Sequence, residues 1–257
     1  MSLLQHLEEL RWRLVRSVAV IIVISIVLWI YQEWIMDTFF LSMSHSDFIT
    51  FDFFCRNFNF MCSDEIPIDF QSTTVSGQFS YALMMSFMGG LVLAFPFVFY
   101  QLWSFVKPGL KTNEKTMVKG IVFYVSMLFF IGILFGYFIV APMSVQFFGT
   151  YSISKNIENN FTISSYMSMV LSTIFYTGLF FLLPVVAYIM GKIGLVSSGF
   201  LKKYRKHSIV GVLILAAIIT PPDIISQVIV SIPILLLYEI GIFVVKRVEK
   251  KRANQVD

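Results

Sequence analysis

The chain has 257 residues, of which 57% are hydrophobic and only 13% charged, and its formal net charge is +4. Soluble domains carry roughly 25% charged and about 45–50% apolar residues, so this apolar excess is too large for one water-facing core. The basic residues stand in short clusters between apolar runs, which argues against a nucleic-acid partner. His6, His45 and His207 are far apart in sequence, and neither a metal site nor a cofactor is predicted. No nucleotide-binding glycine loop or catalytic triad pattern is found, so an enzyme is the weakest function class.

Six apolar runs predict an all-α, polytopic integral membrane protein, because about 20 helical residues are needed to span roughly 30 Å of hydrocarbon. The first run follows a basic flank and has no small-residue cleavage site after it, so we expect a retained anchor. Two spans, the fifth and the sixth, are expected to be short. Pro221-Pro222 stop the fifth, whose length requires thinned lipid, water entry or a partner helix. We expect a single membrane domain over 1–257, with transmembrane helices at 14–31, 79–103, 118–140, 166–191, 208–219 and 224–245.

The distribution of Lys and Arg predicts the orientation. All of the 19 basic residues except Arg56 and Lys155 fall at the amino terminus, around the loops after the second and fourth spans, or in the tail 246–257. By the positive-inside rule these segments, and both termini, are cytoplasmic. The external side then receives a long loop, 32–77, which contains Cys55 and Cys62. An oxidising compartment would favour a disulfide between them, and the alternative is two unpaired thiols.

Two acidic residues near the predicted cytoplasmic face have ordinary structural interpretations. Residues 1–13 are predicted to form an amphipathic surface helix with leucines in one stripe. Glu9 lies off that stripe, and an i,i+4 pair with Arg13 is worth only a few tenths of a kcal/mol. Pro108-Gly109 marks a turn before the third span. Glu114 falls in the first turn of that span, where the helix dipole favours a carboxylate.

Polar residues also occur around the fifth and sixth spans. Asp223 follows the proline pair and can cap the sixth helix. Gln227 lies at membrane depth, where an amide needs a partner from a neighbouring helix or an associating protein. Glu239 stands well inside an apolar run, about two turns from the cytoplasmic end, where it can reach interfacial water or Lys246 and Arg247. Such a carboxylate raises a functional hypothesis, which we weigh equally with a structural role near the interface.

Three motifs occur in order along the chain. They are His6-Leu7-Glu8-Glu9-Leu10-Arg11-Trp12-Arg13-Leu14, then Pro96 and Tyr100-Gln101-Leu102-Trp103-Ser104-Phe105 leading to Pro108-Gly109-Leu110 and Glu114, then Thr220-Pro221-Pro222-Asp223-Ile224-Ile225-Ser226-Gln227 with Pro233 and Tyr238-Glu239. Together they resemble the TatC family of the twin-arginine translocase, and their order, spacing and six-span topology agree over nearly the whole chain. Members of this family move folded proteins across bacterial or thylakoid membranes.

The resemblance implies a receptor for twin-arginine signal peptides in the bacterial inner membrane. Glu9 and Glu114 would face the cytoplasm and bind the paired arginines, since a carboxylate accepts a planar guanidinium in bidentate fashion and lysine cannot copy this. Arg11, Phe105 and Pro108 would hold or line that patch. The family also implies energy from the proton motive force and a homo-oligomer within the translocase complex.

The resemblance further implies that Thr220 and Gln227 dock the single-span partners TatB and TatA beside the short helices. Two departures accompany it: Leu182 stands in the fourth span where many members carry a polar residue, and the loop 32–77 follows no family motif. Two other function classes remain open. One is an ion-coupled transporter of a small solute with Glu239 and Asp223 in its path, against which the lack of internal repeats argues. The other is a lipid-embedded scaffold with no cargo.

Overall fold

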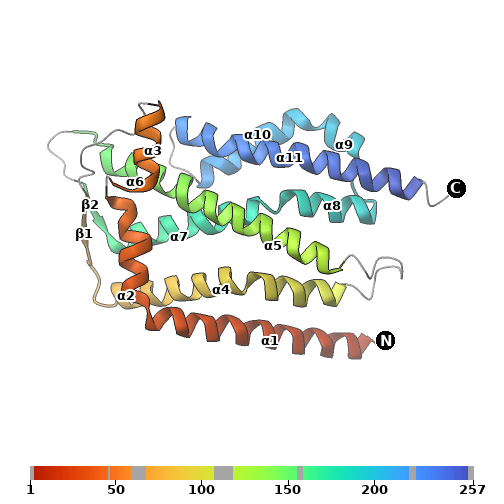
Figure 1. Cartoon of the computed structure of the whole chain (residues 1–257), viewed down its shortest axis with the longest axis horizontal. Coiled ribbons are helices and arrows are strands. Elements are labelled where there is room, and N and C mark those ends of the chain that lie inside the picture. The colour runs from red at the N-terminus through yellow and green to blue at the C-terminus, as the bar shows by residue number, and fades with distance from the viewer. Residues whose placement is uncertain are drawn as a thin grey trace. The chain divides into compact units, whose positions relative to one another are not determined.

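The structure, a computed structural model, describes residues 3–45, 47–58, 68–106, 118–154, 159–219 and 224–253. Regular structure in these ranges is almost entirely helical (Figure 1). Five described stretches are long and apolar enough to cross a membrane, namely His6–Ile30, Gly77–Phe105, Gly120–Thr150, Ile163–Ile193 and Gln227–Lys250. Many large apolar side chains on these helices are exposed, which lipid contact explains. The chain is therefore a multi-pass helical membrane protein.

The chain divides into two compact units, which are described separately. Unit 1 comprises Met1–His45, Ile68–Met127 and Asn159–Leu171, and unit 2 comprises Ser46–Pro67, Leu128–Glu158 and Ser172–Asp257.

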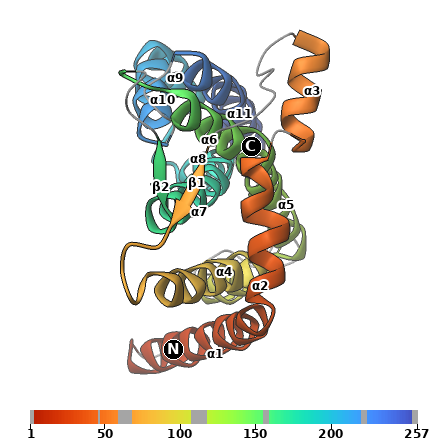
Figure 2. The same ribbon diagram turned by 90° about the vertical axis from the view of Figure 1, so that its left-hand side faces the viewer.

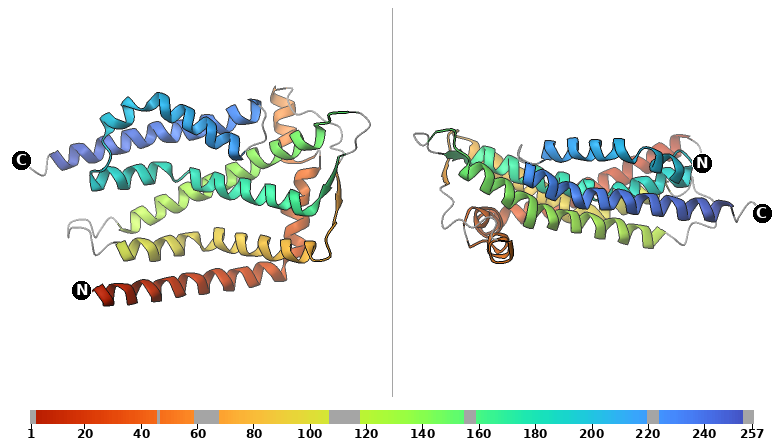
Figure 3. Two further views of the ribbon diagram at one scale, coloured as in Figure 1. Left: turned by 180° about the vertical axis from the view of Figure 1, so that it is seen from behind. Right: turned by 90° about the horizontal axis from the view of Figure 1, so that it is seen from above.

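Unit 1 is built on the packing of α1 (Leu3–Ile30) against α4 (Gly77–Val106), which lie side by side (Figures 1 and 3). No Gly or Pro interrupts the sequence of α1, so the predicted surface helix 1–13 and the predicted span 14–31 are one uninterrupted helix. The two helices approach closely at Gly90. A Cβ there would lie 3.0 Å from the Ile21 carbonyl oxygen and overlap the side chain of Ser25. Glycine at this position is thus required by packing.

The other elements of unit 1 are short. After α1 come α2 (Gln32–Ile35), a π-helical turn η1 (Met36–Phe40) and a 3₁₀ turn η2 (Leu41–Ser44). Strand β1 (Asp69–Gln71) pairs in parallel with β2 (Asn160–Thr162), as Figure 2 shows. The buried Tyr166 donates its hydroxyl to the Phe40 carbonyl at 2.5 Å and packs on Phe70, with ring centroids 4.7 Å apart. The sequence predicted helices alone, and three-residue strands are too short to show an alternating pattern.

Unit 2 contains α3 (Ile49–Phe58), the parts of the third and fourth apolar stretches from Leu128 and Ser172 onward, and the last helices. The third apolar stretch is α5 (Val118–Phe135), a π-helical turn η5 (Gly136–Val140) and α6 (Ala141–Thr150) in succession. The fourth is α7 (Ile163–Phe180) followed by α8 (Leu183–Ile193). The predicted single helix 166–191 is broken because Pro184 has no N–H to bond the Phe180 carbonyl, and its ring clashes with that group.

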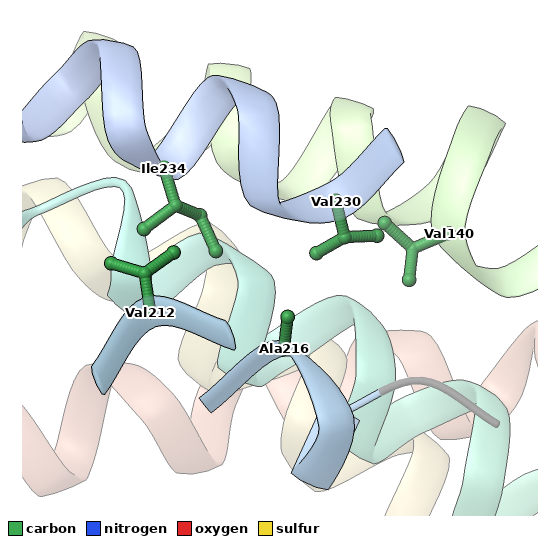
Figure 4. Close-up of a cluster of buried hydrophobic side chains, with 5 residues drawn as sticks. All are labelled: Val140, Val212, Ala216, Val230 and Ile234. Carbon is green, nitrogen blue, oxygen red and sulfur yellow. The ribbon is translucent and has the colours of Figure 1, made fainter. Parts of the chain in front are cut away.

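The last helices of unit 2 are α9 (Ser198–Lys203), α10 (Arg205–Ile219) and α11 (Ile224–Ala253), and α11 packs on α8, α9 and α10. Figure 4 shows the core where η5, α10 and α11 meet, formed by Val140, Val212, Ala216, Val230 and Ile234. With 15 residues, α10 is about 22 Å long, against roughly 30 Å of hydrocarbon. The fifth helix is therefore short, as predicted, although it begins three residues before position 208. The prediction that the sixth is also short is wrong, because α11 has 30 residues and its stretch Gln227–Lys250 is long enough to cross a membrane.

Candidate functional site

Glu9 lies in the second turn of α1 and forms an ion pair with Arg13. The Arg13 Nε and Nη2 atoms donate to one carboxylate oxygen, Glu9 Oε1, at 3.0 and 2.5 Å. Both side chains are largely buried, with 29% of Glu9 and 22% of Arg13 exposed. The i,i+4 pair expected from the sequence is thus present. Among the described residues Arg13 is the partner of Glu9, and the second oxygen, Oε2, accepts no bond from them.

Arg13 also reaches from α1 to α4. Its Nη1 atom lies 3.5 Å from both the backbone carbonyl and the side-chain oxygen of Gln101, a residue that is 7% exposed. These bonds are long, so each is weak. Together they connect the two helices and hold the Glu9 carboxylate at a fixed place on α1. A charged network at a half-buried position is more rigid than a solvated surface pair.

Aromatic side chains surround this end of α4. The His6 ring of α1 stacks on Phe105 of α4, with centroids 4.2 Å apart and planes 15° from parallel. Trp103 is 6% exposed and stacks on Phe99. The structure therefore brings two predicted site residues, Glu9 and Phe105, to the same end of the α1–α4 pair.

Among the described residues, Arg11 is a predicted member of this site that is not brought to Glu9. The exposed Arg11 places its guanidinium over the ring of its neighbour Trp12, 5.7 Å from the centroid. Pro108 and Glu114 lie outside the described residues. The meeting of Glu114 with Glu9 therefore stays a prediction.

The second candidate region is the pair α10 and α11 in unit 2. Gln227 donates from Nε2 to the Leu213 carbonyl of α10 at 3.0 Å, and Ser231 donates to the Gln227 carbonyl at 2.6 Å. The sequence left two kinds of partner open for this amide, a neighbouring helix or an associating protein. The structure shows a contact with the neighbouring helix α10. Thr220 and Asp223 lie outside the described residues.

Glu239 is half exposed and pairs with Arg205 at the start of α10, with Nη2 and Oε2 2.6 Å apart. The sequence suggested Lys246 or Arg247 as partners. Arg247 lies instead over the Phe243 ring, 4.4 Å from the centroid. Glu239 belongs to a set of contacts that fasten the α9–α10 segment to α11.

Two further contacts complete that set. The Tyr238 hydroxyl donates to the Leu201 carbonyl at 2.8 Å. The carboxylate of Glu249 accepts from the Ser198 backbone N–H at 2.9 Å and from the Ser198 hydroxyl, at the amino end of α9. A carboxylate is stabilised at that helix end. The α9–α10 segment is thus held on α11 by polar contacts from residues between Tyr238 and Glu249.

Several structurally important residues were not identified from the sequence. Gly132 and Gly136 form a Gly-x-x-x-Gly pattern, a known signal for close helix packing in membranes, and a Cβ on Gly132 would lie 2.9 Å from the Gly178 Cα. Thr50, which is 5% exposed, donates to the Phe138 carbonyl, and no sequence signal connects residues so far apart.

The predicted disulfide, the unusual Leu182 and the histidine-poor sequence can each be compared with the structure. Cys55 is disulfide-bonded, and Cys62 lies outside the described residues, so the pairing of these two stays a prediction. Leu182 lies half-buried in the break between α7 and α8. In the described part of the chain no three His, Cys, Asp or Glu side chains gather as a metal site.

Comparison with known proteins gives consistent results. Residues 5–233 match a family model described as Sec-independent protein translocase protein (TatC). The protein of that name from Blattabacterium sp. subsp. Periplaneta americana is 38% identical, over 96% of each chain. The one from Helicobacter pylori (strain ATCC 700392 / 26695) is 35% identical, over 95% of this chain and 87% of its own length. A crystal structure of the twin arginine translocase receptor TatC in DDM superposes with a TM-score of 0.69 at 28% identity, covering 93% of this chain and 98% of the other.

Proposed function

The chain belongs to the TatC family of Sec-independent protein translocase proteins, a transport family, and we propose that it is the receptor and core subunit of a twin-arginine translocase. In this proposal it spans the bacterial inner membrane six times, with α10 as the short crossing beside the five long apolar stretches. Both termini face the cytoplasm, as the Lys and Arg distribution favours. Transport of folded cargo is driven by the proton motive force.

The contact geometry at Glu9 carries the receptor proposal. A guanidinium already binds this carboxylate with two N–H donors on Oε1. No described residue bonds Oε2, so this oxygen can accept a second guanidinium, which charge-assisted hydrogen bonds would hold. Arg13 and Gln101 fix the acceptor in place, which lowers the entropy lost on binding. Glu114 supplies the carboxylate for the second arginine, and Phe105 and Pro108 line the peptide beside them.

The α10–α11 pair supports the assembly half of the proposal. The Gln227 amide nitrogen is satisfied by Leu213, and no described residue bonds its side-chain oxygen. Together with Thr220, that oxygen offers a polar contact for the single-span partners TatB and TatA. Because α10 is about 22 Å long, lipid beside it is thinned or replaced by a partner helix. Several copies of this subunit assemble in the complex.

The transporter alternative gains no support. It needs an acidic residue in a membrane path, and none of the buried residues that the structure describes is Asp or Glu. Glu239 is half exposed and paired with Arg205. Asp223 lies outside the described residues.

The receptor proposal is tested by photocrosslinking a twin-arginine signal peptide to the purified protein. Glu9→Gln and Glu114→Gln should each weaken capture about five- to tenfold, the effect of losing one charge-assisted hydrogen bond to the peptide. Glu8→Gln is the matched control, because this exposed neighbour of Glu9 faces another side of α1. A peptide with Lys-Lys should crosslink poorly to every form. Equal capture by the wild type and all three variants would refute the proposal.

A further inference from the structure

Unit 1 contains a cavity of about 440 Å³ at the end of the α1–α4 pair opposite Glu9. It is lined by α2, η1, β1, the first turns of α4 and the start of α7. Glu9 and Ile30, the last residue of α1, are 21 positions apart, which is roughly 32 Å along that helix and about the hydrocarbon thickness of roughly 30 Å, and Glu33 follows in α2. The cavity therefore lies at the membrane surface opposite the proposed peptide site.

The floor and the rim of this cavity differ in chemistry. The floor is apolar, with Met85 and Met167 almost fully buried and Met36 half-buried beside them. The rim is polar and carries the exposed side chains of Glu33 and Gln78, with Gln32, Gln71, Ser72 and Tyr81. Methionine side chains adapt to irregular apolar ligands. The cavity thus suits a ligand with a polar head and a flexible apolar end.

Among the described residues that line the cavity, Glu33 carries the one charge, and none is Lys, Arg or His. The Glu33 carboxylate favours a ligand that carries an ammonium group. Acceptor oxygens elsewhere in the head of that ligand can bond to the Gln amides and to the hydroxyls of Ser72 and Tyr81. An anionic ligand without an ammonium group would meet the Glu33 carboxylate with no cation to offset it.

The cavity also continues into the lipid-facing surface. Phe79 lines it and is 59% exposed, and the apolar side chains of Ile30 on α1 and Leu83 on α4 are also exposed. A lipid molecule can therefore enter from the bilayer with its head in the rim and its chains on the exposed apolar side chains. A water-soluble ligand would gain nothing from that continuation.

We propose that this cavity binds an ethanolamine phospholipid. The ammonium group donates hydrogen bonds to Glu33, the phosphate accepts from the rim amides and hydroxyls, and the first part of an acyl chain covers Met85 and Met167. The bound lipid joins α2, β1 and α4, so it stabilises the external end of unit 1.

The test uses a photoreactive ethanolamine phospholipid, with the reactive group near the head of the acyl chain, added to the full-length protein in mixed micelles. The adduct should map by mass spectrometry to peptides containing Met85 or Met167. Glu33→Gln should reduce labelling about three- to fivefold, the size expected for an exposed ion pair. Asp37→Asn is the matched control, since Asp37 is an exposed acid four residues further on that does not line the cavity.

Competition on the wild type needs no variant and so does not depend on folding. Unlabelled ethanolamine phospholipid should displace the probe, choline and glycerol phospholipids should do so several-fold less well, and glycerophosphoethanolamine, which has no acyl chains, should not displace it. Equal competition by the glycerol phospholipid, unchanged labelling of Glu33→Gln, or an adduct that maps elsewhere would each overturn the proposal.

Discussion

Replacement of Thr50 by Val should destabilise unit 2 by removing one buried hydrogen bond. The Thr50 hydroxyl donates to the carbonyl of Phe138, which lies in the π-helical turn η5. In an α-helix that carbonyl would accept from the N–H of residue 142, and Pro142 has none. Thr50 is 5% exposed, so water cannot replace its hydroxyl. The hydroxyl thus satisfies a carbonyl that the proline leaves without its helical donor.

Valine has the shape of threonine without the donor, so the cost is that of an unsatisfied buried carbonyl, about 1–2 kcal/mol. The free energy of unfolding can be measured by SDS titration in mixed micelles. In a thermal scan the same loss lowers Tm by about 2–4 °C per kcal/mol for a chain of this size. Thr50→Ser keeps the donor and should recover most of the stability.

A double-mutant cycle makes the reasoning refutable. Pro142→Ala supplies a backbone N–H to the Phe138 carbonyl, so Thr50→Val should cost about 1 kcal/mol less in the Pro142→Ala background. The cavity left by the proline ring cancels in the cycle, because the single and the double variant that carry Pro142→Ala both contain it. If Thr50→Val lowers the free energy of unfolding equally in both backgrounds, the Thr50 hydroxyl does not replace the N–H that Pro142 fails to donate to the Phe138 carbonyl.

Two further predictions concern unit 2. Gly132→Ala would place a Cβ 2.7 Å from the Cβ of Phe181, so it should lower the free energy of unfolding by about 1–3 kcal/mol, measured by the same SDS titration. Gly211→Ala has no atom within 4 Å of the new Cβ and should be neutral or slightly stabilising, and equal losses from both would contradict the packing argument. Glu239→Gln should change stability by less than about 1 kcal/mol, because Glu239 and Arg205 are half exposed, and this difference should shrink at high salt. A loss that is large and independent of salt would show that the pair is buried in the membrane.

Local chemistry accounts for the parts of the site that the sequence predicted. The Glu9–Arg13 pair was expected because residues four apart meet on one helix face in any helix. The shortness of α10 was expected because two prolines follow it and cannot continue a helix. For Gln227 the sequence predicted a hydrogen bond to a neighbouring helix or to an associating protein, because an amide at membrane depth needs a hydrogen-bond partner.

Long-range contacts could not be predicted in the same way. Arg13 and Gln101 are 88 residues apart, and so are Thr50 and Phe138. Arg205 was not considered as a partner for Glu239, because the turn from α9 into α10 decides where its guanidinium lies. The break in the predicted helix 166–191 was missed although Pro184 was visible, since prolines are tolerated in membrane helices and Pro96 does remain inside α4.

Composition and spacing by themselves determined that this chain is a multi-pass membrane protein, where its five long apolar stretches lie, and which family its motifs resemble. Hydrocarbon has no water to satisfy a peptide group, so any sufficiently long apolar segment must be helical whatever its neighbours are. Only the tertiary structure decided which polar groups meet inside and between those helices: Arg13 with Gln101, Thr50 with the Phe138 carbonyl, and Glu33 with the rim of a methionine-floored cavity. These contacts depend on distances of a few ångströms between segments far apart in the chain, and no local periodicity records such distances.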